Sequence, residues 1–355
     1  MRPRARTFLF GSLGALALGV GALVACVSGF DPQSKVDSVR LFGVRADKPY
    51  AKPGDDVNLE VLMTDARKVK ARPLKLYWIP VVCVNPRDDL YYLCFAPPTD
   101  GGPNFIPAGP LADAGLEGGV DAGGFSGAAL DNIPTGIDLG PFLPQGTTFS
   151  FHMPPNAVQP RQGIDPYGIA IVFNIACAGQ VRLAARDPSG GPQQVPVLCT
   201  DEDGNKLPPS DYVIGISRVY AYDTRTNANP VIEKMTKDGV DVDQAAGITV
   251  DTCKAEKRAD CNEIKIDVRV PDDAWEVNPA EVGVTRHEQI WVDYYSDIGE
   301  FDSDARLLFD TTKGRVSESE TKYRAPADPV DGTLWAVVHD NRGGAAFYVT
   351  SIHVR

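Results

Sequence analysis

Alternation of apolar and polar residues is the feature of this 355-residue chain that most restricts its fold. Residues 57–63 read VNLEVLM and residues 264–270 read IKIDVRV, so apolar side chains recur at every second position. That period places them on one face of a half-buried β-strand. The chain's 34 glycines and 29 prolines separate such runs with turns, and we find no helical periodicity over more than about two turns. The sequence therefore predicts an all-β fold.

The length and the order of the strands predict two domains. At roughly 150 residues per domain, a chain of this size holds about two. The strongly β-prone segment 213–222 completes one set of strands, and the pattern restarts at the NPVI of residues 229–232. We therefore place a boundary near Thr226, with a first domain over residues 37–226 and a second over residues 227–355.

The turns and one aromatic residue carry a family resemblance. A strand, the Pro53-Gly54 turn and an alternating strand follow one another, and Trp78 lies at the distance expected of a buried aromatic. Near the chain's end, Asp340–Gly344 forms the turn of a predicted hairpin. These features resemble bacterial immunoglobulin-like and PKD-like domains. The resemblance implies two tandem immunoglobulin-like β-sandwiches. Pro80 predicts a bulge or a local edge within the first.

A long glycine- and proline-rich segment interrupts the first predicted domain. Residues 97–146 contain 12 glycines and 8 prolines and no lysine or arginine. This composition does not form a packed core, so we expect a mostly disordered insertion. Such a segment is either a solvated spacer or a loop that recognises a partner.

The N-terminal residues predict export. Arg2, Arg4 and Arg6 precede an uncharged apolar stretch over residues 7–25, which is typical of a secretory signal. The Leu-Val-Ala-Cys sequence ending at Cys26 resembles the lipobox of bacterial lipoproteins. The resemblance implies that residues 1–25 are removed as a signal peptide and that the sulfur of Cys26 carries a diacylglycerol unit. Residues 26–36 would then form the lipidated cysteine and a tether.

Two other interpretations of this segment stay open. The apolar run is long enough for an uncleaved transmembrane anchor, or Cys26 is a structural cysteine behind an ordinary signal. Lipidation leaves an even number of other cysteines, which favours it. Val27 differs from the aspartate that commonly retains lipoproteins in the inner membrane, so the resemblance implies the outer membrane of the bacterial cell.

The remaining six cysteines predict a disulfide framework, because an exported chain folds in an oxidising compartment. Six cysteines allow 15 pairings, and we expect the local one because each local pair brackets a hairpin or loop. The predicted pairs are Cys83 with Cys94, Cys177 with Cys199, and Cys253 with Cys261. A thiolate metal site is the alternative, but the sequence has no CxxC, and its four histidines lack ligand spacing.

The net charge disfavours nucleic acid as a partner. The whole chain carries a formal charge of −12, and removal of the predicted signal with its three arginines lowers it to −15. A surface of this sign repels phosphate backbones.

The sequence contains no recognisable catalytic motif. There is no GxSxG elbow, no HExxH helix and no glycine-rich phosphate loop between a strand and a helix. The acidic loop YYSDIGEFDSD is a weak calcium candidate, since calcium accepts several oxygen ligands in irregular geometry, and a solvated loop is the alternative. Its possible ligands are Asp297, Glu300, Asp302 and Asp304. We expect no other cofactor.

Exposed aromatic residues could bind sugar by stacking. The candidates are Tyr91, Tyr92, Trp275, Trp291 and Tyr323.

We expect a non-catalytic protein that is anchored to the membrane by lipid and serves as an adhesin, a scaffold or an assembly subunit of the cell envelope. Its partner would be an envelope protein or a glycan. The alternative is a carbohydrate-binding or carbohydrate-active envelope protein.

Overall fold

The computed structural model describes residues 32–95, 104–107, 136–184, 195–255, 260–278 and 285–355. Residues 34–355 form one compact unit, and residues 1–33 form another, of which only Pro32 and Gln33 are described. The described residues form β-strands and short 3₁₀ turns without an α-helix, so the all-β prediction is confirmed. Among the described residues we find no helical segment with the length and hydropathy of a membrane span.

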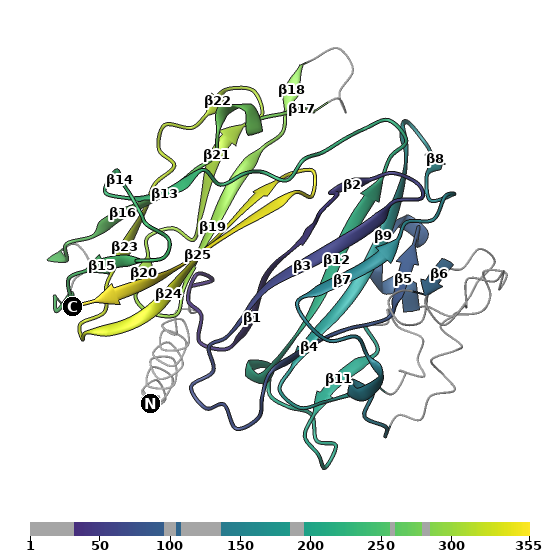
Figure 1. Cartoon of the computed structure of the whole chain (residues 1–355), viewed down its shortest axis with the longest axis horizontal. Helices are drawn as coiled ribbons and strands as arrows, with labels where there is room; N and C mark the ends of the chain where they lie inside the picture. Colours follow the sequence, from purple (N-terminus) through teal and green to yellow (C-terminus); the bar gives the residue numbers. More distant parts are fainter. Residues whose placement is uncertain (1–31, 96–103, 108–135, 185–194, 256–259, 279–284) are drawn as a thin grey trace, which may run out of the picture. The chain divides into compact units, whose positions relative to one another are not determined.

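The strands fall into two groups in chain order (Figure 1). The first group contains β1 (Val39–Ala46), β2 (Tyr50–Ala51), β3 (Asp56–Asp65), β4 (Lys75–Trp78), β5 (Val81–Val84), β6 (Asn104–Pro107), β7 (Thr148–His152), β8 (Gln159–Arg161), β9 (Ile164–Cys177), β10 (Gln180–Leu183), β11 (Val197–Thr200) and β12 (Tyr212–Ala221). Its 3₁₀ turns are η1 (Arg87–Asp89), η2 (Tyr91–Phe95), η4 (Gly140–Phe142) and η5 (Pro209–Asp211).

The second group contains β13 (Lys234–Lys237), β14 (Val240–Asp241), β15 (Ile248–Val250), β16 (Ile264–Arg269), β17 (Val277–Asn278), β18 (Arg286–His287), β19 (Ile290–Ser296), β20 (Glu300–Phe301), β21 (Ala305–Asp310), β22 (Gly314–Arg315), β23 (Thr321–Arg324), β24 (Val330–Asp340) and β25 (Ala345–Val354), with the 3₁₀ turn η7 (Asp272–Ala274). The segment between β12 and β13 includes Thr226, the predicted boundary.

The central strands of both groups pair in the same order, and the second group has β14, β20 and β22 as additional edge strands. In the first, one sheet runs β1-β3-β7 and the other β2-β12-β9-β5-β6. In the second, the corresponding sheets run β14-β13-β16-β23-β20 and β15-β25-β24-β19-β21-β22. In each group an early short strand, β2 or β15, crosses to the second sheet and pairs parallel with the last strand. The two groups therefore repeat one topology.

Each group packs its two sheets around a shared apolar core, as in a β-sandwich. In the first core, Val57 and Leu59 of β3 meet Val172 of β9. Trp78 is fully buried there, stacks on Phe149 at 4.9 Å and donates its indole N–H to the Gly146 carbonyl. In the second core, alternate residues of β16 and β19 pack together.

Two of the predicted local features are present. Gly54 has a φ of 83°, and the Asp55 amide donates to the Lys52 carbonyl at 3.0 Å, which is the turn that Pro53-Gly54 predicts. Strand β4 ends at Trp78 and β5 begins at Val81. The interruption spans Pro80, because proline cannot donate to the ladder.

Strand β9 is buried on both faces from Gly168 to Cys177. Ile169, Ile171, Phe173 and Ile175 lie on its outer face in a second apolar cluster, which is completed by the β10–β11 hairpin and η2. Two disulfides hold these covering segments to the sheet, Cys83–Cys94 and Cys177–Cys199, with Cα separations of 5.9 and 5.7 Å. The third, Cys253–Cys261, lies in the second group. The predicted three pairs are thus confirmed.

The two sandwiches meet through a smaller apolar cluster. Strand β1 has a bulge at Phe42, since Leu41 pairs with Met63 and Gly43 pairs with Leu62. The extra residue turns Phe42 away from its own core and toward β24 and β19, where its ring lies 4.9 Å from that of Trp335 and 4.8 Å from that of Tyr295. A bulge that re-aims one side chain is a common device at strand edges.

Three sequence expectations need correction. The expected disordered insertion, residues 97–146, lies mostly outside the described residues. Within it, however, strand β6 pairs with β5. Residues 136–146 also pack against the sheet, where the Leu139 amide donates to the Val181 carbonyl. The predicted tether extends to Val36, yet that residue is buried and its amide donates to Ser296. The alternation in β16 predicts an exposed Asp267, yet this residue is buried and accepts a bond from Ser319.

Candidate interaction surface

Four tyrosines gather where β2, β9 and β12 lie side by side. Parallel pairing of β2 with β12 sets Tyr50 opposite Tyr220, and Tyr222 follows two residues later on the same face. Tyr167 joins them from the neighbouring strand β9. The ring centroids lie 4.6 Å apart for Tyr50 and Tyr222, 5.8 Å for Tyr167 and Tyr220, and 6.0 Å for Tyr167 and Tyr222. We call these four residues, all half-buried, the tyrosine cluster.

Three arginines border the tyrosine cluster. The guanidinium carbon of Arg161 lies 4.4 Å from the ring centroid of Tyr167, that of Arg225 lies 5.3 Å from Tyr222, and that of Arg342 lies 5.6 Å from Tyr50. Cation–π contacts of this kind contribute about 0.5–1 kcal/mol at exposed sites and more where water is excluded. They hold the aromatic rings and the arginine planes in fixed relative positions.

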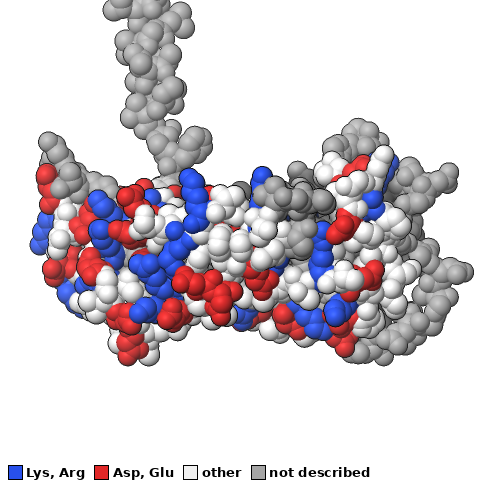
Figure 2. All heavy atoms as spheres, turned by 90° about the horizontal axis from the view of Figure 1, so that it is seen from above, with Lys and Arg blue, Asp and Glu red and all other residues white. Residues whose placement is uncertain are grey.

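Each bordering arginine is also paired with a carboxylate. Arg161 bonds Asp89 at 3.0 Å, Arg225 pairs with Asp165, and Arg342 pairs with Glu276. The Arg161–Asp89 and Arg225–Asp165 pairs are balanced in charge, although the chain is acidic. Figure 2 shows one face of the molecule, on which acidic and basic side chains are interspersed.

The phenols of Tyr50, Tyr167 and Tyr222 remain protonated at physiological pH. Burial, together with the hydrogen bond to Asp89, raises the pKa of Tyr167 to about 12. Burial and the neighbouring Tyr222 raise the pKa of Tyr50 still further, and burial raises that of Tyr222. Neutral phenols present an apolar ring and a hydrogen-bonding hydroxyl, a combination that is enriched at protein interfaces and is also suited to sugars.

The tyrosine cluster could not be predicted from the sequence, for a physical reason. Tyr220 and Tyr222 stand in a strongly β-prone run, which predicts a strand without indicating a binding surface. Tyr50 reaches them through a two-residue parallel strand, which carries no periodic signal. The alternation of Tyr220 with Tyr222 on one face of the last strand was the available signal.

The predicted lipidation residue, Cys26, lies outside the described residues. Three of the four calcium candidates are engaged by other protein groups, and Asp304 accepts the Tyr294 amide through its backbone carbonyl. Asp302 accepts bonds from Arg306, Thr321 and the Lys322 amide, and Asp297 accepts one from the Thr333 amide.

Glu300 pairs with Arg324. Across the described ranges, no group of three or more His, Cys, Asp or Glu side chains is arranged to hold a metal ion. The acidic loop is thus used for local hydrogen bonding, and we do not propose a calcium site there.

The predicted sugar-binding aromatics do not form a common platform. Tyr323 is buried in the second core. Trp275 stacks on His287 at 3.7 Å and Trp291 on His339 at 5.2 Å, both half-buried. Tyr91 and Tyr92 contact each other edge to face in η2. These pairs cover the sheets locally.

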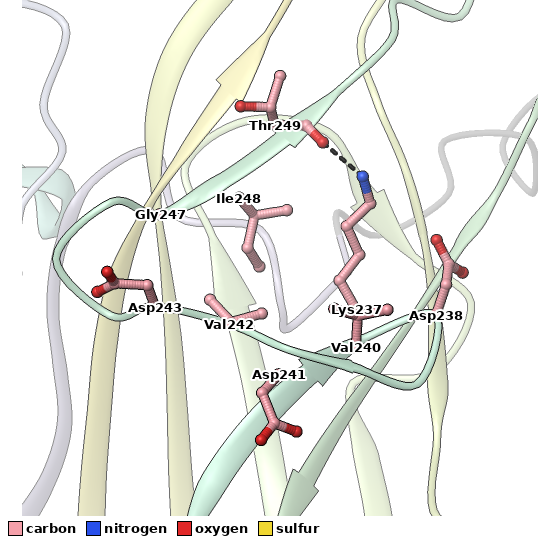
Figure 3. A pocket seen from close by; sticks show the side chains of 9 residues that line it. All are labelled: Lys237, Asp238, Val240, Asp241, Val242, Asp243, Gly247, Ile248 and Thr249. Carbon is pink, nitrogen blue, oxygen red and sulfur yellow. Dashed lines mark hydrogen bonds between the residues drawn. The ribbon is translucent and has the colours of Figure 1, made fainter.

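A shallow hollow of about 370 Å³ lies beside β13–β15 (Figure 3). Its lining includes Asp238, Asp241 and Asp243, and the ammonium of Lys237 donates across it to the Thr249 carbonyl at 2.6 Å. The three carboxylates point in different directions from the hollow. Asp241 is paired with Lys234 at 3.0 Å, so the hollow offers no converging set of ligands.

Comparisons with known proteins give only distant similarities. No family model matches the chain, and no curated protein matches it. Among solved structures it is similar to dimeric latent PorU from Porphyromonas gingivalis, with 12% identity and a TM-score of 0.19, over 90% of this chain and 24% of the PorU chain. It is also similar to Drosophila OTK extracellular domains 3–5, with 10% identity and a TM-score of 0.17, over 91% of this chain and 99% of that one. This chain thus spans about a quarter of the PorU chain, and TM-scores this low do not identify a shared fold.

Proposed function

We propose that the protein is a lipid-anchored, non-catalytic component of the bacterial cell envelope that binds a partner through the tyrosine cluster. Two tandem immunoglobulin-like domains would form its body. The repeated strand order supports this proposal, because both groups send an early strand across to pair parallel with the last strand. The three disulfides suggest an exported protein.

The observation that carries the binding proposal is the tyrosine cluster itself. Tyrosine and arginine are enriched in protein interfaces, where they supply large contact areas with few rotatable bonds. Here the rings are held by neighbouring strands and by the paired arginines Arg161 and Arg225. A surface that is already ordered loses little conformational entropy when a partner binds.

Fractionation tests the anchor. We expect Cys26→Ser to move the protein from the membrane fraction to the soluble fraction, because acyl chains dominate the membrane affinity of an anchored protein. Ser28→Ala is the matched control and should remain in the membrane fraction. Retention of Cys26→Ser in the membrane would contradict lipidation at this position.

Site-specific photo-crosslinking tests the binding surface. A photoreactive residue at Tyr222 should capture a defined partner in intact cells, whereas the same residue at Val240, which is 70% exposed in the second group, should not. Equal labelling at both positions, or none at Tyr222, would oppose the tyrosine cluster as the binding surface.

A glycan is the second candidate partner. Aromatic rings flanked by Arg161–Asp89 and Arg225–Asp165 pairs offer both stacking and paired hydrogen bonds, which sugars use. We expect a polysaccharide ligand to quench tyrosine fluorescence of the wild-type protein and to lose affinity at least tenfold in Tyr222→Ala. If crosslinking at Tyr222 captures a protein and no polysaccharide binds, the partner is a protein and not a glycan.

A further inference from the structure

A buried group of charges lies where the linker and the two sandwiches meet. We call Asn227, Glu276, Glu288, Asp340 and Arg342 the junction cluster. The side chains of Arg342 and Glu288 are 4% and 2% exposed, and Arg342 Nε lies 2.9 Å from Glu288 Oε2. Arg342 also pairs with Glu276, and its backbone amide donates to Asp340 Oδ1 at 2.7 Å.

The junction cluster connects three parts of the chain. Arg342 belongs to the β24–β25 turn of the second sandwich, donates to Asn227 Oδ1 in the linker, and lies over the ring of Tyr50 in the first sandwich. Asn229, two residues further along the linker, donates to the Ala46 carbonyl at 2.7 Å and accepts from the Ala345 amide at 2.9 Å. Displacing Arg342 would therefore loosen the contacts between the two sandwiches at this end.

The charges within the junction cluster do not balance. The cluster holds one guanidinium and three carboxylates: the guanidinium pairs with Glu276 and lies beside Glu288, and the third carboxylate, Asp340, accepts from the Arg342 backbone amide. Of the other titratable neighbours, Tyr50 faces Arg342, and His287 stacks on Trp275 at 3.7 Å. Burying a carboxylate without full compensation is costly, so a proton on one of the three relieves the excess charge.

Glu288 is the carboxylate best placed to keep that proton. It is the least exposed of the glutamates in the cluster, and its Oε2, although 2.9 Å from Arg342 Nε, is not aligned for a hydrogen bond with it. Asp340, by contrast, accepts aligned bonds from the amides of Arg342 and Gly344 and from Asn227. Burial, followed by the charge of Asp340, raises the pKa of Glu288 to about 7.

We propose that the junction cluster is a pH-sensitive latch. With Glu288 protonated, Arg342 holds the linker and both sandwiches together, and ionisation of Glu288 weakens this closure. The proposal is independent of the partner that the tyrosine cluster binds and of lipidation at Cys26.

The direction of the pH effect follows from the two pKa values of Glu288. In an opened junction the carboxyl titrates near its ordinary value of 4.5, and in the closed junction near 7. The closed form therefore binds more protons between these values, so closure weakens as the pH rises from about 4.5 to about 7 and changes little above.

Hydrogen exchange on the full-length protein in detergent tests the latch. The amides of Arg342, Gly344 and Ala345 all donate within the junction. Their protection factors, corrected for the intrinsic pH dependence of exchange, should fall about tenfold between about pH 6 and about pH 8.5 in the wild type. Glu288→Gln should show no such fall, and Glu318→Gln, an exposed glutamate on the same sandwich, should behave as the wild type.

A second variant keeps the test decisive if Glu288→Gln fails to fold, as judged by near-ultraviolet circular dichroism. Glu276→Gln removes a carboxylate near Glu288 and leaves Arg342 free to pair with it, so the fall in protection should move to lower pH. Protection that is constant with pH in the wild type, or that falls equally in Glu288→Gln, would overturn the proposal.

Discussion

At the scale of single residues, the unusual feature of the first sandwich is a polar side chain in its core. Asn174 is 1% exposed on β9, and neither its amide nitrogen nor its oxygen has a hydrogen-bond partner within the described residues. It lies opposite Gly215 of β12, where a Cβ would come within 2.4 Å of the Asn174 oxygen. The missing side chain at Gly215 thus provides the space that Asn174 occupies.

We expect Asn174→Leu to raise the free energy of unfolding by about 1–2 kcal/mol. Leucine has the same branching as asparagine and removes two buried polar groups that cost about 1–3 kcal/mol each when unpaired. Chemical denaturation measures the change. Gly215→Ala, which adds the colliding Cβ, should destabilise the protein. If the Asn174→Leu variant is less stable than the wild type, Asn174 has a bonded partner such as a buried water.

The tyrosine and junction residues show where sequence analysis reaches its limit at this scale. Glu276 and Arg342 pair across 66 positions, and Asn227 and Arg342 across 115. Neither spacing has a periodic signal, because the first is a tertiary contact within the second sandwich and the second depends on where the linker lies against it. The local cysteine pairs, by contrast, follow from spacing, since each closes a short loop.

At the scale of elements, period-two alternation predicts strands well where one face is buried. Strands β3 and β16 match the predicted segments, and the glycine turn at Gly54 and the break at Pro80 follow from the backbone properties of those residues. The bulge at Phe42 could not be predicted, because it serves a contact with the other sandwich rather than a local preference.

We expect Phe42→Ala to lower the free energy of unfolding by about 3 kcal/mol, as is usual when a buried phenylalanine is truncated. Its ring is 7% exposed and contacts both Trp335 and Tyr295. Urea denaturation followed by tryptophan fluorescence measures the loss. Val69→Ala, at a side chain that is 76% exposed, is the control and should change stability by less than about 0.5 kcal/mol; a similarly small change for Phe42→Ala would show that the contact contributes little.

The disulfide between Cys177 and Cys199 holds the β10–β11 hairpin over the outer face of β9. Closing a loop of this size restricts the unfolded chain by about 3 kcal/mol. We expect the double variant Cys177→Ser/Cys199→Ser to lose about that much stability and to expose Ile175 and Phe173 to solvent, which binding of a hydrophobic dye measures. Unchanged dye binding would mean that the hairpin packs without the disulfide.

At the scale of the whole molecule, two sandwiches of repeated topology are joined at both ends of their contact. The segment Ser34–Val36 bonds to Ser296 at one end, and Asn229 bridges Ala46 and Ala345 at the other. The apolar cluster around Phe42 and Trp335 lies in the same contact. The all-β class and the disulfide pairs were predictable from the sequence, but this joining was not, since it arises from single long-range contacts.

We propose that this disulfide-stabilised β-protein is anchored through a lipid on Cys26. Mass spectrometry of the N-terminal peptide from the membrane-extracted protein can detect that lipid. We predict that the mature chain begins at Cys26 and that this residue carries the mass of a diacylglycerol unit with or without an additional N-acyl chain. A chain that retains residues 1–25, or one with an unmodified Cys26, would contradict the claim.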